Sequence, residues 1–190
     1  PTPQTRLTSL GGAAQLVVIG ASTGGPRVVQ QVLRDLPSNF PAAVLVVQHI
    51  ADGFTRGMVD WLAESCRIPI HLGQSGDVAR PGHVYVAPDN LHLLINSDGI
   101  LSLSSQPAII QRPSVDVTMQ RAAEAYGSQT IGVLLTGMGR DGASGMAAIY
   151  RTGGYTIAQS GETCVVFGMP KALFPAGSSA ATGGSNGTTV

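Results

Sequence analysis

The sequence predicts an α/β fold: a doubly wound, mainly parallel sheet with helices on both faces and a small antiparallel insertion. Three apolar runs rich in β-branched residues are predicted to form buried strands, at 16–19, 43–49 and 130–136. Helical segments alternate with these runs, an order that is typical of parallel sheets with crossover connections. Hydrophobic residues make up 43% of the chain and aromatic residues 5%, which favours tightly packed parallel strands over an aromatic-rich sandwich.

Turn and capping signals give the remaining elements along the chain. Helices are predicted between the strands, at 27–36, 53–66, 114–126 and 142–151. Ser114, with Pro113 before it, is the expected N-cap of the third helix. Short strands separated by glycine and proline turns form an expected antiparallel meander, at 68–72, 83–87, 91–95 and 100–103. A further strand is predicted at 155–159.

Length, charge and cysteine content limit the class of protein. The 190 residues suit one domain with a full core, and 11 basic against 11 acidic residues argue against nucleic-acid binding. Cys66 and Cys164 are too far apart in the sequence to resemble a disulfide framework or a metal knuckle. No apolar run approaches the ~20 residues that span a bilayer, and no signal peptide is recognisable. We therefore expect a soluble, cytoplasmic protein without membrane insertion.

The two ends differ in composition from the rest of the chain. Residues 1–14 are polar and rich in small side chains, which is typical of a linker. Residues 176–190 are nearly all Gly, Ser, Thr and Ala, which predicts a flexible tail. One domain is expected between them, at 15–175.

Ser22 stands at the most informative point of the sequence. It has Gly20 and Gly24 two residues to either side and lies between a predicted strand and a predicted helix, which is the sequence form of a nucleophile elbow. Because glycine has no Cβ, such a turn can tighten until the hydroxyl projects from the end of the sheet. The following helix N-terminus would supply free N–H groups and a partial positive charge. The alternative interpretation is an ordinary tight turn.

His49 and Asp141 follow two other predicted strands, so the carboxyl ends of parallel strands would bring them to the same edge as Ser22. A serine needs a base to become a good nucleophile, and a carboxylate fixes the tautomer of a histidine base. The chain order Ser, His, Asp differs from that of the α/β-hydrolases. Alternatively, His49 is a structural histidine, and Asp141 caps a helix that begins at Gly142.

Two other functions compete with a hydrolase. Residues 137–142 match G-x-G-x-x-G after a strand, and Glu162 lies about 20 residues later, as in a dinucleotide site. The carboxylate of Asp141 would, however, repel a bound pyrophosphate, and the motif lies late in the chain. A non-catalytic binding module of the same fold is the other possibility. The remaining histidines have no zinc-site spacing, so we expect no metal at His71, His83 and His92.

Six separate blocks, in order, resemble the catalytic domain of the chemotaxis protein-glutamate methylesterases of the CheB type. The resemblance covers about residues 16–173 and is much more specific than any single motif. The blocks are IGASTGG at 19–25, QH at 48–49, PGHVYVAP at 81–88, RPSVDV at 112–117, LTGMGRDG at 135–142 and VVFGMP at 165–170.

The resemblance implies hydrolysis of glutamate γ-methyl esters, and deamidation of glutamines, on the cytoplasmic domain of methylated chemoreceptors. By the same resemblance, Ser22 is the nucleophile, His49 the base and Asp141 the orienting carboxylate. Thr23 and Met138 would position the imidazole or line the oxyanion pocket. No cofactor is implied. Residues 15–175 would then be the methylesterase catalytic domain.

Three features depart from the family pattern. Members usually carry an N-terminal phosphoacceptor regulatory domain, which is absent from this sequence, so we expect such a domain as a partner in cis or in trans. The last apolar segment of the family is replaced by the Gly/Ser-rich tail. Arg140 stands where many members have asparagine.

Overall fold

The computed structural model describes residues 14–174 and 187–189. Its main sheet consists of β1 (Leu16–Ala21), β2 (Ala43–Gln48), β3 (Ile70–Leu72), β4 (Val84–Val86), β7 (Thr130–Leu134), β8 (Tyr155–Ala158) and β9 (Gly187–Thr189). Every pairing in this sheet is parallel, in the order β3-β4-β2-β1-β7-β8-β9. A second, small sheet pairs β5 (His92–Ile95) antiparallel to β6 (Leu101–Ser104).

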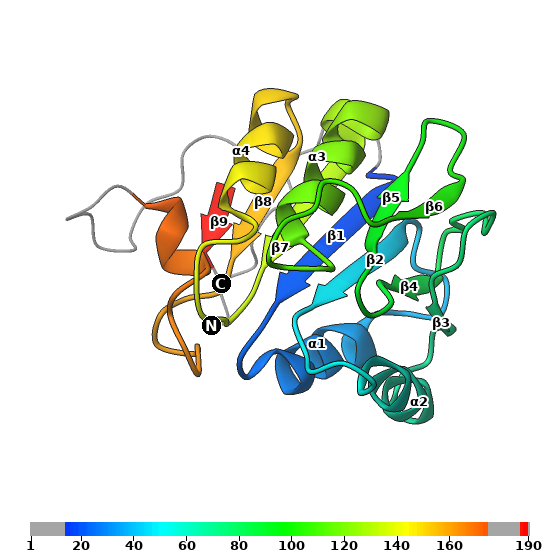
Figure 1. The fold of residues 1–190 in the computed structure, drawn as a ribbon, viewed down its shortest axis with the longest axis horizontal. Coiled ribbons are helices and arrows are strands. Elements are labelled where there is room, and N and C mark those ends of the chain that lie inside the picture. Colours follow the sequence, from blue (N-terminus) through cyan, green and yellow to red (C-terminus); the bar gives the residue numbers. More distant parts are fainter. Residues whose placement is uncertain (1–13, 175–186, 190) are drawn as a thin grey trace, which may run out of the picture.

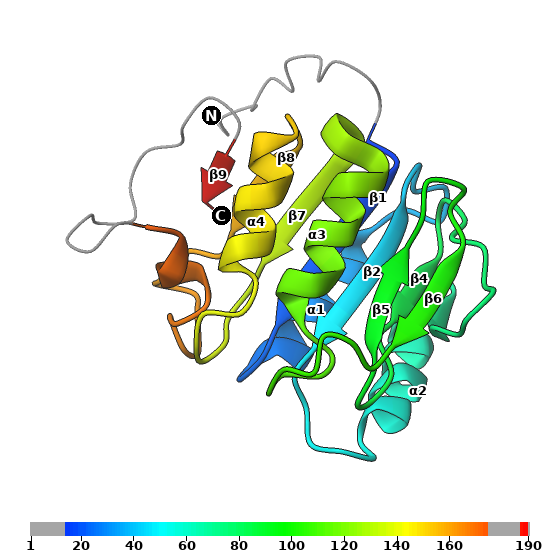
Figure 2. The same cartoon turned by 45° about the horizontal axis from the view of Figure 1, so that its top comes forward.

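Helices cover both faces of the main sheet (Figures 1 and 2). On one face lie α1 (Gly25–Asp35) and α2 (Thr55–Ser65). On the other lie α3 (Val115–Tyr126) and α4 (Ala143–Arg151), together with the β5–β6 pair. Two short 3-10 helices complete the set, η1 (Gly127–Gln129) and η2 (Pro170–Leu173). This arrangement confirms the predicted doubly wound fold. In the described part of the chain, no helix has the length and apolar character that crossing a membrane requires.

The central strands are buried on both faces, which explains their unbroken apolar runs. Leu16 and Val18 belong to the core beneath α3 and α4. Val17 and Ile19 belong to the core beneath α1 and α2. Because the side chains of a strand alternate between its faces, one apolar segment of β1 serves both cores.

Two of the short strands pair differently from the prediction, which placed them in an antiparallel meander. β3 and β4 instead join the main sheet, parallel to each other, with β4 next to β2. The connecting segment 73–83 is too long for a tight hairpin, and it carries the chain back so that both strands run in the same direction. The predicted antiparallel insertion is therefore limited to β5 and β6 within the described chain.

The terminal segments are described only in part. Residues 1–13 of the expected linker lie outside the described residues, as do 175–186 and 190 of the expected tail. Gly187–Thr189 form β9, which pairs in parallel with β8. Three residues of the segment expected as a flexible tail thus lie at an edge of the sheet.

β1 occupies the position where the strand order reverses. β2 pairs with one side of β1 and β7 with the other, and the chain visits the β2 side first (Figure 2). In open α/β sheets, ligands bind outside the carboxyl ends of the strands at such a switch point. The fold therefore predicts a ligand site at the loop that follows β1.

Gly20, in β1, allows the start of α3 to approach the sheet closely, since an added Cβ would lie 2.3 Å from Val115 Cγ1. We expect Gly20→Ala to lower the free energy of unfolding by about 1–3 kcal/mol, because the new methyl group overpacks this contact. Urea denaturation measures the change. The control is Gly57→Ala in α2, where an added Cβ meets nothing within 4 Å. That variant should gain roughly 0.5–1 kcal/mol, and equal effects of the two substitutions would contradict the packing argument.

Candidate active site

Ser22, His49 and Asp141 lie at the carboxyl edge of three neighbouring strands. Ser22 directly follows β1, His49 directly follows β2, and Asp141 lies in the loop between β7 and α4. Backbone hydrogen bonds tie the strand ends together. The His49 N–H donates to the Ala21 carbonyl at 2.9 Å, and the Ser22 N–H donates to the Thr136 carbonyl at 3.0 Å. The strand order thus places the three predicted residues at one edge.

A tight turn presents Ser22. Gly24 has a φ of 80°, in the left-handed region that glycine adopts readily. The Gly25 N–H donates to the Ser22 carbonyl at 2.8 Å, so α1 begins directly after the turn. The Ser22 side chain is partly exposed, and its hydroxyl has no hydrogen bond within the described residues. This is the strand–turn–helix context that a nucleophile elbow requires.

His49 and Asp141 form a direct pair, with His49 Nε2 at 2.8 Å from Asp141 Oδ2. Their side chains are only 18% and 11% exposed, so water screens the contact weakly. The carboxylate fixes the orientation of the ring and assigns the proton to Nε2. Nδ1 is therefore the nitrogen that remains available as an acceptor.

The Asp141 carboxylate also accepts three hydrogen bonds from the start of α3. Oδ1 accepts from the Ser114 hydroxyl at 2.9 Å and the Asp116 N–H at 3.0 Å, and Oδ2 accepts from the Val115 N–H at 2.7 Å. Burial alone would raise the pKa of the Asp141 carboxyl. The hydrogen bonds from His49 and from these three residues outweigh burial and lower that pKa. The site thus holds Asp141 in its charged form.

The structure changes the capping role that the sequence suggests for Asp141. The N-cap of α4 is Gly142, which contributes no side-chain cap, whereas Asp141 caps α3. In return Asp116, in the first turn of α3, accepts the Gly145 N–H of α4 at 2.7 Å. Burial, helped by the nearby charge of Asp141, raises the pKa of Asp116. Asp141, just before α4, thus caps α3, and Asp116, in α3, caps α4, so the N-termini of the two helices are linked.

His92 supports the site indirectly. It is fully buried, its Nδ1 accepts the Ser114 N–H at 3.1 Å, and its Nε2 donates to the Pro107 carbonyl at 3.0 Å. These partners require a neutral ring with its proton on Nε2. Ser114 is the N-cap of α3, as predicted, and accepts the Val117 N–H. His92 therefore fixes the residue that donates to Asp141.

Thr23 and Met138 are both exposed, and Met138 is 75% exposed. Gly137, just before Met138, packs so closely on the turn that an added Cβ would lie 2.7 Å from Ser22 Cβ. The backbone N–H groups of Thr23 and Met138 have no hydrogen-bond acceptor within the described residues. Both donors are therefore available to a ligand. In the same residues, no hydrogen bond joins either side chain to His49.

Thr136 and Gln48 contact the site but were not singled out from the sequence. The Thr136 hydroxyl, fully buried, donates to the Thr23 carbonyl at 3.0 Å and accepts the Val166 N–H at 2.9 Å. The Gln48 side chain donates to backbone carbonyls on either side of the site. A polar residue that ends an apolar, buried strand is the sequence signal common to both.

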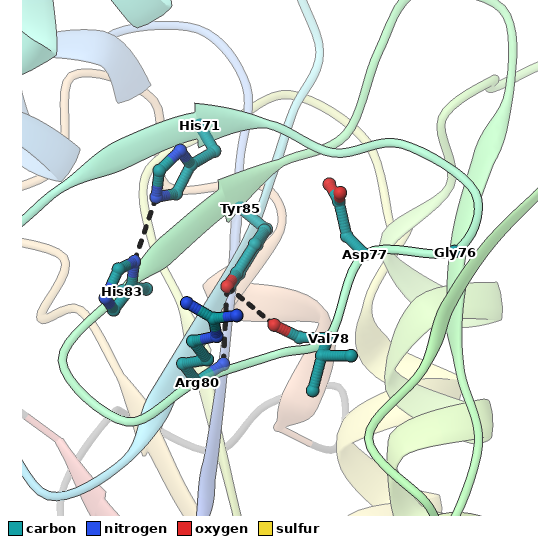
Figure 3. Close-up of a pocket in the computed structure, with 7 residues that line it drawn as sticks. All are labelled: His71, Gly76, Asp77, Val78, Arg80, His83 and Tyr85. Atoms are coloured by element: carbon teal, nitrogen blue, oxygen red, sulfur yellow. Dashed lines mark hydrogen bonds between the residues drawn. The ribbon is translucent and has the colours of Figure 1, made fainter.

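A cavity of about 370 Å³ lies elsewhere, at the edge strand β3 and its neighbour β4 (Figure 3). In it, His71 Nε2 and His83 Nδ1 are hydrogen-bonded at 2.9 Å, with an angle of 9° between the ring planes. Burial, with His71 and Arg80 nearby, lowers the pKa of His83. The two nitrogens face each other and do not converge on a common metal position. No three His, Cys, Asp or Glu side chains of the described chain are grouped so as to hold a metal ion.

We expect the lowered pKa of Asp141 to make part of the folding stability pH-dependent. An unfolded aspartate titrates near ~3.9, so this contribution is complete above that pH and is lost as pH falls through the lower folded-state pKa. Asp116, whose pKa is raised, acts in the opposite sense. Asp141→Asn should therefore lose less stability on acidification than the unsubstituted protein, as measured by urea denaturation across the acid range. Asp98→Asn, at an exposed turn, is the control. An unchanged acid dependence in Asp141→Asn would contradict the pKa direction.

Comparisons with known proteins agree with the fold. The family model for CheB methylesterase matches residues 17–183. The protein-glutamate methylesterase/protein-glutamine glutaminase 2 of Anaeromyxobacter dehalogenans is 49% identical over 86% of this chain and 48% of its own length. The corresponding protein 1 of Syntrophus aciditrophicus is 46% identical over 82% of this chain and 45% of its own length. The chain thus spans about half the length of the curated relatives it matches.

A solved structure extends the comparison to three dimensions. The crystal structure of the Thermotoga maritima CheB methylesterase catalytic domain matches with a TM-score of 0.83 at 40% sequence identity. The match covers 94% of this chain and 93% of that one. The sequence match across most of the chain and the shared architecture lead to the same conclusion: this chain belongs to the CheB methylesterase family.

Proposed function

We propose that the chain is a serine hydrolase that cleaves glutamate γ-methyl esters on the cytoplasmic domains of methylated chemoreceptors and releases methanol. The observation that carries the proposal is the His49–Asp141 pair, at 2.8 Å, formed by residues that follow the two strands flanking β1, after which Ser22 lies. The relatives named above as protein-glutamate methylesterases support the choice of ester.

In the proposed reaction, the Ser22 hydroxyl attacks the ester carbonyl while Nδ1 of His49 takes its proton. Asp141, bonded to Nε2, stabilises the imidazolium that forms. The imidazolium then protonates the departing methoxide, which leaves as methanol. Water, deprotonated by His49, hydrolyses the acyl-enzyme and regenerates Ser22 with a glutamate carboxylate as product.

The free backbone N–H groups of Thr23 and Met138 are the proposed oxyanion donors. Thr23 follows the nucleophile, the position that supplies one donor in nucleophile elbows. Met138 follows Gly137, which packs against Ser22. Each such donor contributes roughly 3 kcal/mol to stabilising the tetrahedral oxyanion in a comparable hydrolase. In this proposal, the side chains of both residues line the entrance.

Glutamine deamidation is proposed as a second reaction at the same site. An amide passes through an analogous tetrahedral intermediate, in which the His49 imidazolium would protonate the leaving amide nitrogen, so that ammonia departs in place of methanol. The relatives carry the name protein-glutamine glutaminase beside the methylesterase name. We further propose that the protein acts in the cytoplasm and is controlled by a phosphoacceptor regulatory domain, in cis or in trans.

Ser22→Ala should abolish methanol release from methylated chemoreceptor cytoplasmic domains. Because Ser22 lies at a partly exposed turn, the melting temperature of the Ser22→Ala variant should equal that of the unsubstituted protein. Methanol release and thermal unfolding are measured side by side. The control is Ser38→Ala, an exposed serine in the loop before β2, which should keep full turnover. Wild-type turnover in Ser22→Ala would exclude Ser22 as the nucleophile.

Asp141→Asn should lower kcat by about 10⁴-fold, by analogy with a triad aspartate in another hydrolase. An asparagine amide would face His49 Nε2 with a donor and impose the wrong tautomer. Methanol release gives kcat, and Asp98→Asn is again the control for loss of one carboxylate. A loss of only twofold would limit Asp141 to its role as the cap of α3.

A further inference from the structure

Gln48 contacts the backbones of both the proposed nucleophile and the proposed base. It is the last residue of β2 and is 3% exposed. Its Nε2 donates to the Ser22 carbonyl and to the His49 carbonyl, both at 2.8 Å. One carboxamide group therefore joins the turn after β1 to the turn after β2.

This contact lies where the backbone hydrogen bonds between β1 and β2 end. The β1–β2 ladder ends with Ala21 opposite Gln48, and the last backbone bond runs from the His49 N–H to the Ala21 carbonyl. Beyond that point Ser22 has left the strand and turned toward α1. The Gln48 side chain supplies the next connection between the two segments, where backbone pairing no longer can.

The surroundings of Gln48 permit one orientation of the amide. Both carbonyls require a donor, so Nε2 must face them and Oε1 must face away. Oε1 is buried and has no hydrogen-bond partner among the described side chains and backbone. Burying an acceptor in this way costs stability. The strand end therefore retains a glutamine at a stability cost that an apolar residue would avoid.

Gly25 makes room for this amide. A Cβ on Gly25 would lie 2.2 Å from Gln48 Oε1, so any larger residue would displace the glutamine. The Gly25 N–H donates to the same Ser22 carbonyl that accepts from Gln48. The start of α1, the Ser22 turn and the end of β2 thus meet at one carbonyl group.

We propose that Gln48 is a positioning residue of the hydrolase site, whose carboxamide holds the Ser22 turn and the His49 turn in the register that proton transfer needs. The inference rests on the proposed function in one respect, the joint action of Ser22 and His49. Gln48 touches neither reacting side chain. Its effect is therefore on the rate of the chemical step and not on substrate affinity.

The test compares Gln48→Met with the unsubstituted protein. Methionine has a similar length and no polar group, so it removes both bonds and the buried Oε1 together. We expect kcat for methanol release to fall about 10- to 100-fold, since misplacing reacting groups by ~1 Å can cost 10²-fold. KM should stay the same, and this split between kcat and KM is one that a purely structural role would not produce. The control is Gln30→Met, which removes the bond from Gln30 to Ser65 between α1 and α2 and should leave kcat unchanged.

A second variant and a second readout separate the possible outcomes. Gln48→Glu keeps the shape but turns an oxygen toward the two carbonyls, so its kcat should fall at least as far. Labelling of Ser22 by a fluorophosphonate reports nucleophile activation without a receptor substrate. If no methanol is released by the unsubstituted protein, the proposed substrate is wrong, and slower labelling of Gln48→Met still supports the inference. Labelling and kcat of Gln48→Met within twofold of the unsubstituted protein would overturn it.

Discussion

The carboxylate of Asp141 is the interaction on which the rest of the candidate site depends. Two oxygens accept four hydrogen bonds, from His49 Nε2, the Ser114 hydroxyl and the N–H groups of Val115 and Asp116. Without these donors, burial would favour the neutral acid, which could not orient or stabilise an imidazolium. The helix α3 therefore has a chemical role as well as a packing role, because its N-terminus keeps the carboxylate charged.

This dependence extends from the site into the packing of the fold. Asp116, beside the Asp141 carboxylate, caps α4 through the Gly145 N–H, so the starts of α3 and α4 are held relative to each other. Gly145 allows α4 to approach α3 closely, since a Cβ on this residue would lie 2.5 Å from Met119 Cβ. His92 fixes Ser114 from the β5 side. The small antiparallel sheet, which carries none of the proposed catalytic groups, thereby contributes to the position of Asp141.

On the opposite side of Asp141, the Ser22 turn depends on the central position of β1. Its backbone is tied to β7 through the Thr136 carbonyl and to β2 through the Gln48 amide. Because β1 has a parallel neighbour on each side, the turn after it is hydrogen-bonded on both sides to residues at the ends of those neighbouring segments. An edge strand such as β3 could not hold a serine in this way. The site therefore lies at the reversal of strand order because a strand with neighbours on both sides allows the turn after it to be bonded from both sides.

Sequence alone determined the fold class, the order of the elements from β1 to β8 and the placement of Ser22, His49 and Asp141 after strands, because apolar runs, turn residues and motif blocks are local properties. It could not give the pairing of β3 and β4, since the direction of a strand depends on the path of the chain around it. Nor could it show that Asp141 caps α3 in preference to the helix it precedes. The roles of Gln48, Thr136 and His92 were also decided by tertiary structure. Each depends on a hydrogen-bond partner that is distant in sequence, and such partners meet only when the strand order is set.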